Sequence, residues 1–137
     1  MADETIKTVD PKNIWFSQRT AGGNNRADKL RKSMKSEGFI HNPANPVNVV
    51  KTPVSLTTID NTRVAVAQEL GIEKITVVVR EYNDPLPELM IKAKRFGNAK
   101  TWGQALEYRT GNQRPDPLPR YGTAHRPYLP SASEGNN

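Results

Sequence analysis

The sequence predicts a small α+β domain in which helices pack against a short sheet. Runs of β-branched residues, the clearest at 75–79, indicate strands. Apolar residues at helical spacing, as at 26–37 and 60–70, indicate amphipathic helices. Beyond Thr110 five prolines interrupt the chain, which excludes a long helix or a central strand there. We therefore expect one domain over residues 1–110 and a proline-rich basic tail, partly disordered, over 111–137.

The composition allows one modest core and favours an anionic partner. Of the 137 residues 35% are hydrophobic, which is enough for a small core. The formal charge of +6 suits nucleic acid or a nucleotide, although a basic protein without such a partner fits equally well. Without cysteine, disulfides, thiolate metal sites and cysteine nucleophiles are excluded.

No apolar run approaches the roughly 18 residues of a membrane span. The first eight residues lack the apolar region of a secretory signal, so an exported chain would travel as cargo of a larger polypeptide.

Alternating and helical patterns predict the elements along the chain. In order these are the strand 6–9, the apolar run 14–16, the helix 26–37, the strands 46–50 and 55–59, the helix 60–70, the strand 75–79, a helix opened by Pro85-Leu86-Pro87, and a helix from Thr101 to Arg109. The strands 46–50 and 55–59 flank a Thr52-Pro53 turn and are expected to form a hairpin. The unbroken run 75–79 is typical of a strand covered on both faces.

The helices are predicted from their apolar faces and their ends. Residues expected to face the core are Ala27, Leu30, Met34, Val64, Ala67, Leu70, Leu89, Met90, Ala93 and Phe96. Gly38 ends the first helix. Thr101 and Gln104 have the spacing of a capping box, so the last helix begins at this threonine. The neighbouring Trp102 is expected to be a core residue.

The turn at 60–63 is the main candidate for an anion site. A strand leads here into a helix whose first N–H groups lack intrahelical partners and can hold a phosphate. Asp60 is expected to cap the helix by accepting from amides two or three residues further on. Arg63 adds a guanidinium suited to phosphate oxygens, although a cation at this end opposes the helix dipole. The alternative is a capped helix whose arginine pairs with a surface carboxylate.

Polar residues elsewhere are further candidates for the site. Gln18 and Arg19 follow the run 14–16 and are expected either to face the ligand of Arg63 or to lie on a surface loop. His125 is a candidate for proton transfer, since histidine is the commonest general acid or base.

The tail mixes basic and aromatic residues. Arg114, Arg120 and Arg126 with Tyr121 suit phosphate contact and base stacking. The alternative is a basic arm bound loosely to the domain. No metal-binding motif, Walker A loop or dinucleotide-binding turn is present, so no cofactor is evident and a divalent-metal requirement is left open.

Together, these elements resemble the N-terminal domain shared by ParB partition proteins and sulfiredoxin. Over about seventy residues the supporting positions are Gly38, Pro46-Val47-Asn48-Val49, Asp60-Asn61-Thr62-Arg63, Ala67, Gly71 and Ile75-Thr76-Val77-Val78-Val79. The resemblance implies a ParB/sulfiredoxin-like fold with a small mixed sheet and packed helices. It also implies a phosphate site lined by Asp60, Asn61 and Arg63. Sulfiredoxin's catalytic cysteine has no counterpart, which excludes that reductase activity, and no helix-turn-helix of the partition proteins is evident after Val79.

A narrower likeness concerns three short segments. Phe16-Ser17-Gln18, the run 56–63 and Thr101-Trp102-Gly103-Gln104-Ala105 resemble ParB-like toxin domains at the C-termini of bacterial polymorphic toxins of the Rhs and contact-dependent inhibition types. Thr62 replaces the first arginine of that family's Asn-Arg-Arg motif. The resemblance implies an antibacterial toxin, a nuclease delivered as cargo into the target-cell cytoplasm. Its producer would need a cognate immunity protein, expected to be acidic enough to cover a basic cleft.

The leading hypothesis is therefore a nuclease with a phosphate site at a helix N-terminus. Arg63 and Asp60 are assigned to catalysis at the scissile phosphate, with His125 as the proton-transfer candidate. The residues assigned to phosphate or nucleic-acid binding are Gln18, Arg19, Asn61, Thr62, Arg114, Arg120 and Arg126. Two alternatives use the same chemistry without cleavage: a switch that binds ATP or CTP, and a DNA-binding adaptor of the ParB type.

Overall fold

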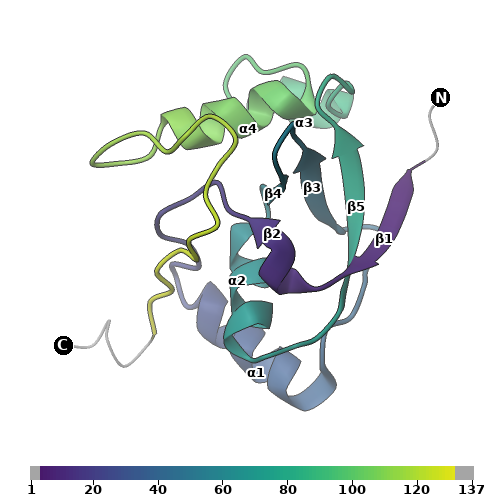
Figure 1. The fold of residues 1–137 in the computed structure, drawn as a ribbon, viewed down its shortest axis with the longest axis vertical. Helices are drawn as coiled ribbons and strands as arrows, with labels where there is room; N and C mark the ends of the chain where they lie inside the picture. Colours follow the sequence, from purple (N-terminus) through teal and green to yellow (C-terminus); the bar gives the residue numbers. More distant parts are fainter. Residues whose placement is uncertain (1–3, 132–137) are drawn as a thin grey trace.

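A five-stranded mixed sheet forms the centre of the domain, and helices cover it (Figure 1). The computed structural model describes residues 4–131. The elements are β1 (Thr5–Val9), the 3-10 helix η1 (Pro11–Asn13), β2 (Ile14–Trp15), α1 (Arg26–Glu37), β3 (Val47–Lys51), β4 (Leu56–Thr58), α2 (Asn61–Glu69), β5 (Ile75–Glu81), α3 (Glu88–Lys92) and α4 (Trp102–Gly111). The predicted α+β class, with a mixed sheet and packed helices, is confirmed.

The sheet has the order β1-β5-β3-β4-β2. Strands β3 and β4 form the predicted hairpin, with Val50 opposite Thr57. Strand β5 lies parallel to β3 and antiparallel to β1, so it has a partner on each side. Val77, Val78 and Val79 of β5 are all buried, which confirms a strand covered on both faces.

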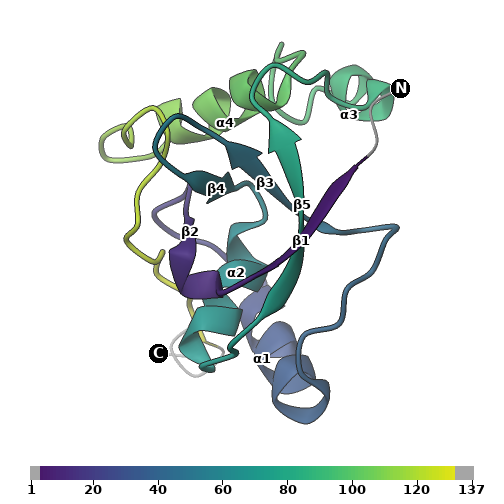
Figure 2. The same ribbon diagram turned by 45° about the vertical axis from the view of Figure 1, so that its right-hand side comes forward.

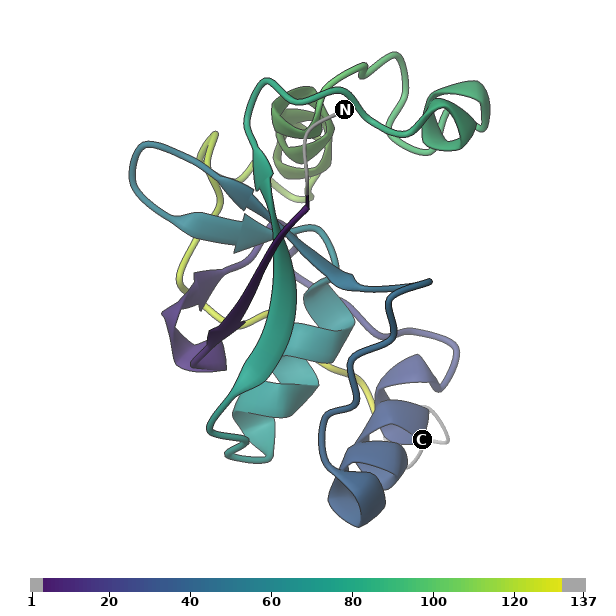
Figure 3. The ribbon, with the colours of Figure 1, turned by 90° about the vertical axis from the view of Figure 1, so that its right-hand side faces the viewer.

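Two clusters of apolar side chains lie on opposite faces of the sheet. On one face Val47 and Val49 of β3 pack with residues of α1 and α2, including Val64. On the other face Val50 packs with Trp102 of α4. Because successive side chains of a strand alternate in direction, β3 contributes to both clusters. Figure 3 shows α1 and α2 at one end of the molecule and α3 and α4 at the other, with the sheet between them.

The helix predicted after Pro87 is only partly correct. Helix α3 spans five residues, Glu88–Lys92, and Leu89, assigned to its apolar face, is 82% exposed. Ala93 is exposed as well. The helix cannot continue because Lys94 has a φ of 53°, in the left-handed region. Phe96 is buried as predicted, but it reaches the core from the loop beyond this break.

The capping prediction for α4 is confirmed. The Thr101 hydroxyl accepts a hydrogen bond from the amide of Gln104 at 3.1 Å, as expected for an N-cap. The Gln104 side chain accepts from the amide of Lys100 at 2.8 Å, one residue earlier than in a standard capping box. Trp102 is 2% exposed and is a core residue.

The residues 111–131, here called the C-terminal segment, run along the domain (Figure 2). The segment pairs with the loop after β2: Phe16 and Thr123 exchange backbone hydrogen bonds of 2.7 and 2.9 Å. Further on, Leu129 is buried in the core shared with α1 and α2. Disorder was also expected at the extreme C-terminus, but residues 132–137 lie outside the described residues.

Arg31 of α1 holds the end of the C-terminal segment. Its guanidinium donates to the carbonyl oxygens of Leu129 and Pro130 at 3.3 and 3.2 Å. The same group makes a two-point ion pair with Glu69 of α2, at 2.6 and 3.0 Å. The hydrogen bond from Arg31 lowers the pKa of the Glu69 carboxyl, while partial burial opposes this. The arginine therefore links α1, α2 and the C-terminal segment.

None of the helices within residues 4–131 has both the length and the apolar character needed to span a membrane.

Candidate anion-binding site

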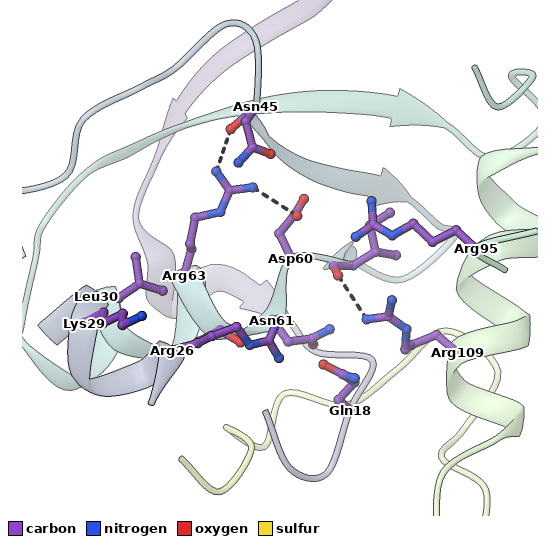
Figure 4. Close-up of a pocket in the computed structure, with 12 residues that line it drawn as sticks. Gln18, Arg26, Lys29, Leu30, Asn45, Asp60, Asn61, Arg63, Arg95 and Arg109 are labelled. Atoms are coloured by element: carbon purple, nitrogen blue, oxygen red, sulfur yellow. Dashed lines mark hydrogen bonds and ion pairs between the residues drawn. The ribbon is translucent and has the colours of Figure 1, made fainter. Parts of the chain in front are cut away.

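A cavity of about 500 Å³ opens at the N-terminus of α2 (Figure 4). Its walls come from the loop after β2, from α1, from the loop before β3, from the start of α2, from the loop after α3 and from α4. The lining residues are Gln18, Arg26, Lys29, Leu30, Asn45, Ile59, Asp60, Asn61, Thr62, Arg63, Arg95 and Arg109. The cavity therefore lies at the turn that the sequence singled out.

The lining of this cavity is strongly cationic. Five of the lining residues are arginine or lysine, and Asp60 is the single carboxylate among them. The cations come from α1, from α2 and from the region of α3 and α4, so they surround the space instead of forming one row. A cleft lined by one sign of charge concentrates ions of the opposite sign. No group of three or more His, Asp or Glu side chains placed to hold a metal ion is found within residues 4–131.

Asp60 does not cap α2 as predicted. Its side chain makes no hydrogen bond to the amides of the first helical turn. Instead, Oδ2 accepts from the backbone amide of Asn48 in β3 at 2.7 Å, and Oδ1 pairs with Arg63 Nη2 at 3.0 Å. The prediction was wrong because a partner distant in sequence, the Asn48 amide, competes with the local amides. The carboxylate consequently leaves the first N–H groups of α2 to other acceptors.

Arg63 is fixed by backbone carbonyl groups. Its Nη1 donates to the Asn45 oxygen at 2.6 Å and its Nη2 to the Pro46 oxygen at 2.8 Å. The sequence also allowed a second interpretation, in which Arg63 pairs with a surface carboxylate. Arg63 does pair with a carboxylate, that of Asp60, but this carboxylate lines the cavity. The guanidinium is held in one position and keeps further N–H donors for a ligand.

Asn61 fastens the loop after β2 to the start of α2. The residue is 2% exposed. Its Oδ1 accepts from the Ser17 amide at 2.8 Å, and its Nδ2 donates to the Ser17 hydroxyl at 2.9 Å. That hydroxyl donates in turn to the Thr58 carbonyl at 2.7 Å. The side chain of Asn61 therefore places the neighbouring Gln18 in the wall of the cavity, while the half-buried Thr62 lines the wall beside it.

Arg109 is a wall residue that the sequence analysis did not assign to the site. Its Nη1 donates to the Ile59 carbonyl at 3.2 Å, and its guanidinium lies 5.1 Å from the centre of the Phe96 ring. Burial lowers the pKa of Arg109, and the nearby cations Arg95 and Arg26 lower it further, while Asp60 opposes them. Among the described residues, no carboxylate lies within ion-pair distance of this guanidinium. An anion in the cavity would neutralise this partly desolvated charge.

The spacing of residues in α4 contains a signal that Arg109 lies on the buried face of this helix. Trp102, Ala105, Leu106 and Arg109 follow the spacing i, i+3, i+4, i+7, which places the arginine on the buried face of its helix. A charged residue on an apolar face needs a partner or a ligand. Arg95, by contrast, is exposed and follows the left-handed Lys94, so no periodic pattern indicates its position.

The predicted site residues are divided between two cavities. A second cavity of about 390 Å³ is lined by Gln18, Arg19, Leu118, Thr123, His125, Arg126, Pro127 and Tyr128. Gln18 lines both cavities, whereas Arg19 lines only the second. The Nε of Arg19 donates to the Asp116 carbonyl of the C-terminal segment at 3.1 Å. The structure thus brings Gln18 to the cavity of Arg63 and leaves Arg19 outside it.

Two arginines of the C-terminal segment lie in the wall of neither cavity. Arg114 is exposed and donates to the Gln113 carbonyl at 3.2 Å. Arg120 pairs with Glu107 at 3.2 Å and lies 5.2 Å from the centre of the Tyr121 ring.

His125 lies in the second cavity on an exposed turn. Its Nδ1 is 3.0 Å from the carbonyl oxygen of Arg126. A carbonyl oxygen only accepts, so this nitrogen must be the protonated one for the hydrogen bond to form. The Nε2 of the neutral ring is then an acceptor for a proton.

Comparison with solved structures finds seven chains similar to this one, two of which are given below. No protein-family model matches this chain, and no curated protein does. The chain is similar to a Pnob8-like ParB-N domain, with a TM-score of 0.47 and 16% identity over 79% of this chain and 45% of that one. It is also similar to protein Atu1540 from Agrobacterium tumefaciens, with a TM-score of 0.44 and 10% identity over 72% of this chain and 50% of that one. The chain thus spans about half the length of these solved chains.

Proposed function

We propose that the chain binds the phosphate groups of nucleic acid or of a nucleotide in the cavity at the start of α2. The observation that supports this proposal is the convergence of five basic side chains on a cavity with one carboxylate. Both oxygens of that carboxylate have partners, the Asn48 amide and the Arg63 guanidinium. The positive charge of the walls therefore exceeds what the chain itself neutralises there.

The donors in the cavity are of the kind that binds phosphate oxygens. Arg63 and Arg109 present guanidinium groups held by carbonyl oxygens, a geometry that binds phosphate through paired hydrogen bonds. The first N–H groups of α2 lie in the same wall, at the positive end of the helix dipole. Arg26 and Lys29 on α1 are exposed at the opposite wall and can approach the ligand from there.

A binding experiment with two charge-matched variants of α1 tests the proposal. In Arg26→Gln/Lys29→Gln the cavity loses two cations, and in Lys32→Gln/Lys35→Gln two exposed lysines outside the cavity wall are lost. We expect the first variant to bind a fluorescent oligonucleotide about 10- to 100-fold more weakly, since each of the two exposed cations contributes roughly 1 kcal/mol and about 1.4 kcal/mol is tenfold in affinity. The slope of its log affinity against log salt concentration should become shallower by about two, roughly one for each lost phosphate contact. The second variant should bind nearly as the wild type does.

Equal losses in the two variants would mean that net charge alone attracts the oligonucleotide, and the cavity assignment would be wrong. Wild-type protein that binds neither oligonucleotides nor nucleotides at low salt contradicts the proposed function altogether.

As a second candidate function, we propose that this chain is an antibacterial toxin domain that cleaves the phosphodiester it binds. The three segments that resemble ParB-like toxin domains support it, since Gln18, the start of α2 and α4 contribute to one cavity. His125 in the adjoining cavity supports it too, because its Nε2 can accept a proton from a water molecule that attacks the phosphorus, and can return that proton to the leaving oxygen as the phosphorus–oxygen bond breaks. Arg63 and Arg109 would stabilise the charge that develops on the phosphate. Such a toxin would act in the target-cell cytoplasm, and an acidic immunity protein would cover the cavity in the producer.

Cleavage is tested with plasmid DNA and tRNA, each with and without chelator, together with induced expression in a bacterial cytoplasm. We expect His125→Gln to slow cleavage about 10²- to 10⁴-fold, the usual contribution of a general acid or base, with oligonucleotide affinity retained. Arg114→Gln, an exposed change outside both cavities, is the control. Wild-type protein that leaves both substrates intact and is harmless on expression would reject the toxin hypothesis and leave the binding function standing.

A further inference from the structure

The two cavities adjoin each other at Gln18. This residue lines the cavity of about 500 Å³ at α2 and also the cavity of about 390 Å³ beside the C-terminal segment. Figure 4 shows its side chain beside Asn61 and Arg109, facing the first cavity. Each volume alone falls in the range of pockets that enclose a small ligand, about 300–1,000 Å³. A ligand that extends past the Gln18 side chain therefore reaches the second cavity.

The chemistry of the second cavity differs from that of the first. Leu118, Pro127 and Tyr128 give it an apolar and aromatic wall, with Arg19 and Arg126 beside them. In the first cavity, basic and polar side chains predominate. A cavity lined by both an aromatic ring and guanidinium groups suits a nucleobase and its phosphate, because bases stack on such groups. Tyr128, the aromatic residue of this wall, is 56% exposed.

The wall of the second cavity is held in place by the fold. The Tyr128 amide donates to the Arg19 carbonyl at 2.9 Å, and the Tyr128 carbonyl accepts from the Ala21 amide at 3.0 Å. One residue further on, Leu129 is buried, and Arg31 binds its carbonyl oxygen. Because these walls are already ordered, little free energy is lost to ordering them when a ligand binds.

We infer that the second cavity binds a nucleotide that is covalently continuous with the one in the first cavity. The ligand would then be a single strand of nucleic acid at least two nucleotides long, not a free nucleotide. This inference rests on the proposed function, since it assumes a phosphate group in the first cavity. A single strand fits because its unstacked bases can enter a cavity one at a time, whereas a duplex keeps its bases paired and stacked.

The test compares single-stranded tetranucleotides of uridine and of thymidine with the corresponding 5′-mononucleotides. The variants are Arg126→Gln and Tyr128→Ala in the second cavity, with Lys74→Gln, an exposed change before β5, as the control of equal charge outside both cavities. We expect wild-type protein to bind a tetranucleotide about 10- to 100-fold more tightly than a mononucleotide, in line with the contribution of one stacked base. Each second-cavity variant should lose most of this difference and leave mononucleotide affinity unchanged. Thermal unfolding of each variant shows that the fold is retained.

Tetranucleotide and mononucleotide affinities that are equal in the wild type would overturn the inference and leave the proposed function intact. A duplex of the same length that competes better than the single strand would overturn it as well. A loss in Lys74→Gln as large as that in Arg126→Gln would remove the assignment to the second cavity. If no nucleotide or oligonucleotide binds, the proposed function fails, and the inference fails with it.

Discussion

Arg109→Met is expected to weaken oligonucleotide binding about 10- to 100-fold while the free energy of unfolding changes by no more than about 1 kcal/mol. Burial lowers the pKa of this guanidinium, so its charge is disfavoured in the folded chain without a ligand. Methionine keeps an unbranched apolar side chain and removes the guanidinium group. The folded chain loses one hydrogen bond, to the Ile59 carbonyl, and the contact of the guanidinium with the Phe96 ring, and it gains from the removal of a desolvated cation.

Two measurements are needed for Arg109→Met. Affinity is obtained from titration with a labelled single-stranded oligonucleotide, and stability from urea unfolding at the same pH. Arg114→Met serves as the control, because Arg114 is exposed and lies outside both cavities. If Arg109→Met binds normally, or if it unfolds with a loss of several kcal/mol, Arg109 is a structural residue and the proposed anion site has lost its most buried cation.

Asn61→Ala is expected to lower the free energy of unfolding by about 2–4 kcal/mol, because a buried unpaired polar group costs roughly 1–3 kcal/mol. The substitution removes the acceptor of the Ser17 amide and the donor to the Ser17 hydroxyl, and Ser17 is fully buried. The loop after β2 would lose its attachment to α2. Since this loop holds Gln18 in the wall of both cavities, oligonucleotide affinity should fall together with stability.

Urea unfolding with the midpoint and slope fitted separately measures this effect. Asn83→Ala is the matched control: Asn83 is exposed in the turn after β5, and its loss should change stability by no more than about 0.5 kcal/mol. A change below about 1 kcal/mol in Asn61→Ala would show that water replaces both hydrogen bonds, and the attachment of the loop would then need another explanation.

Elements with strong local patterns were predictable from the sequence. The helix 26–37 and the strand 75–79 occur as expected, because helical spacing and an unbroken β-branched run report directly on burial. The start of α4 was predictable as well, since a cap is a contact between residues three apart. Helix α3 was not, because its end depends on the left-handed conformation of Lys94, for which no local signal exists.

Residues of the site were predictable only where the turn itself defines them. Asp60 and Arg63 line the cavity as the turn indicated, but the carboxylate accepts from Asn48, a residue of another strand. Arg109 joins the site although 46 positions separate it from Arg63 in the sequence. Such a contact depends on how α4 lies across the sheet, which the spacing of residues within α4 does not describe.

The sequence by itself thus determined the class of the fold, the positive charge and the turn at which an anion would bind. Each of these depends on composition or on contacts between residues close in the chain. Only the tertiary structure decided which cations surround the cavity, that Asn61 holds a loop, and that the C-terminal segment adds a second cavity next to Gln18. The physical reason is that burial, desolvation and pairing of a charge depend on all the elements packed around it, and these elements come from distant parts of the chain.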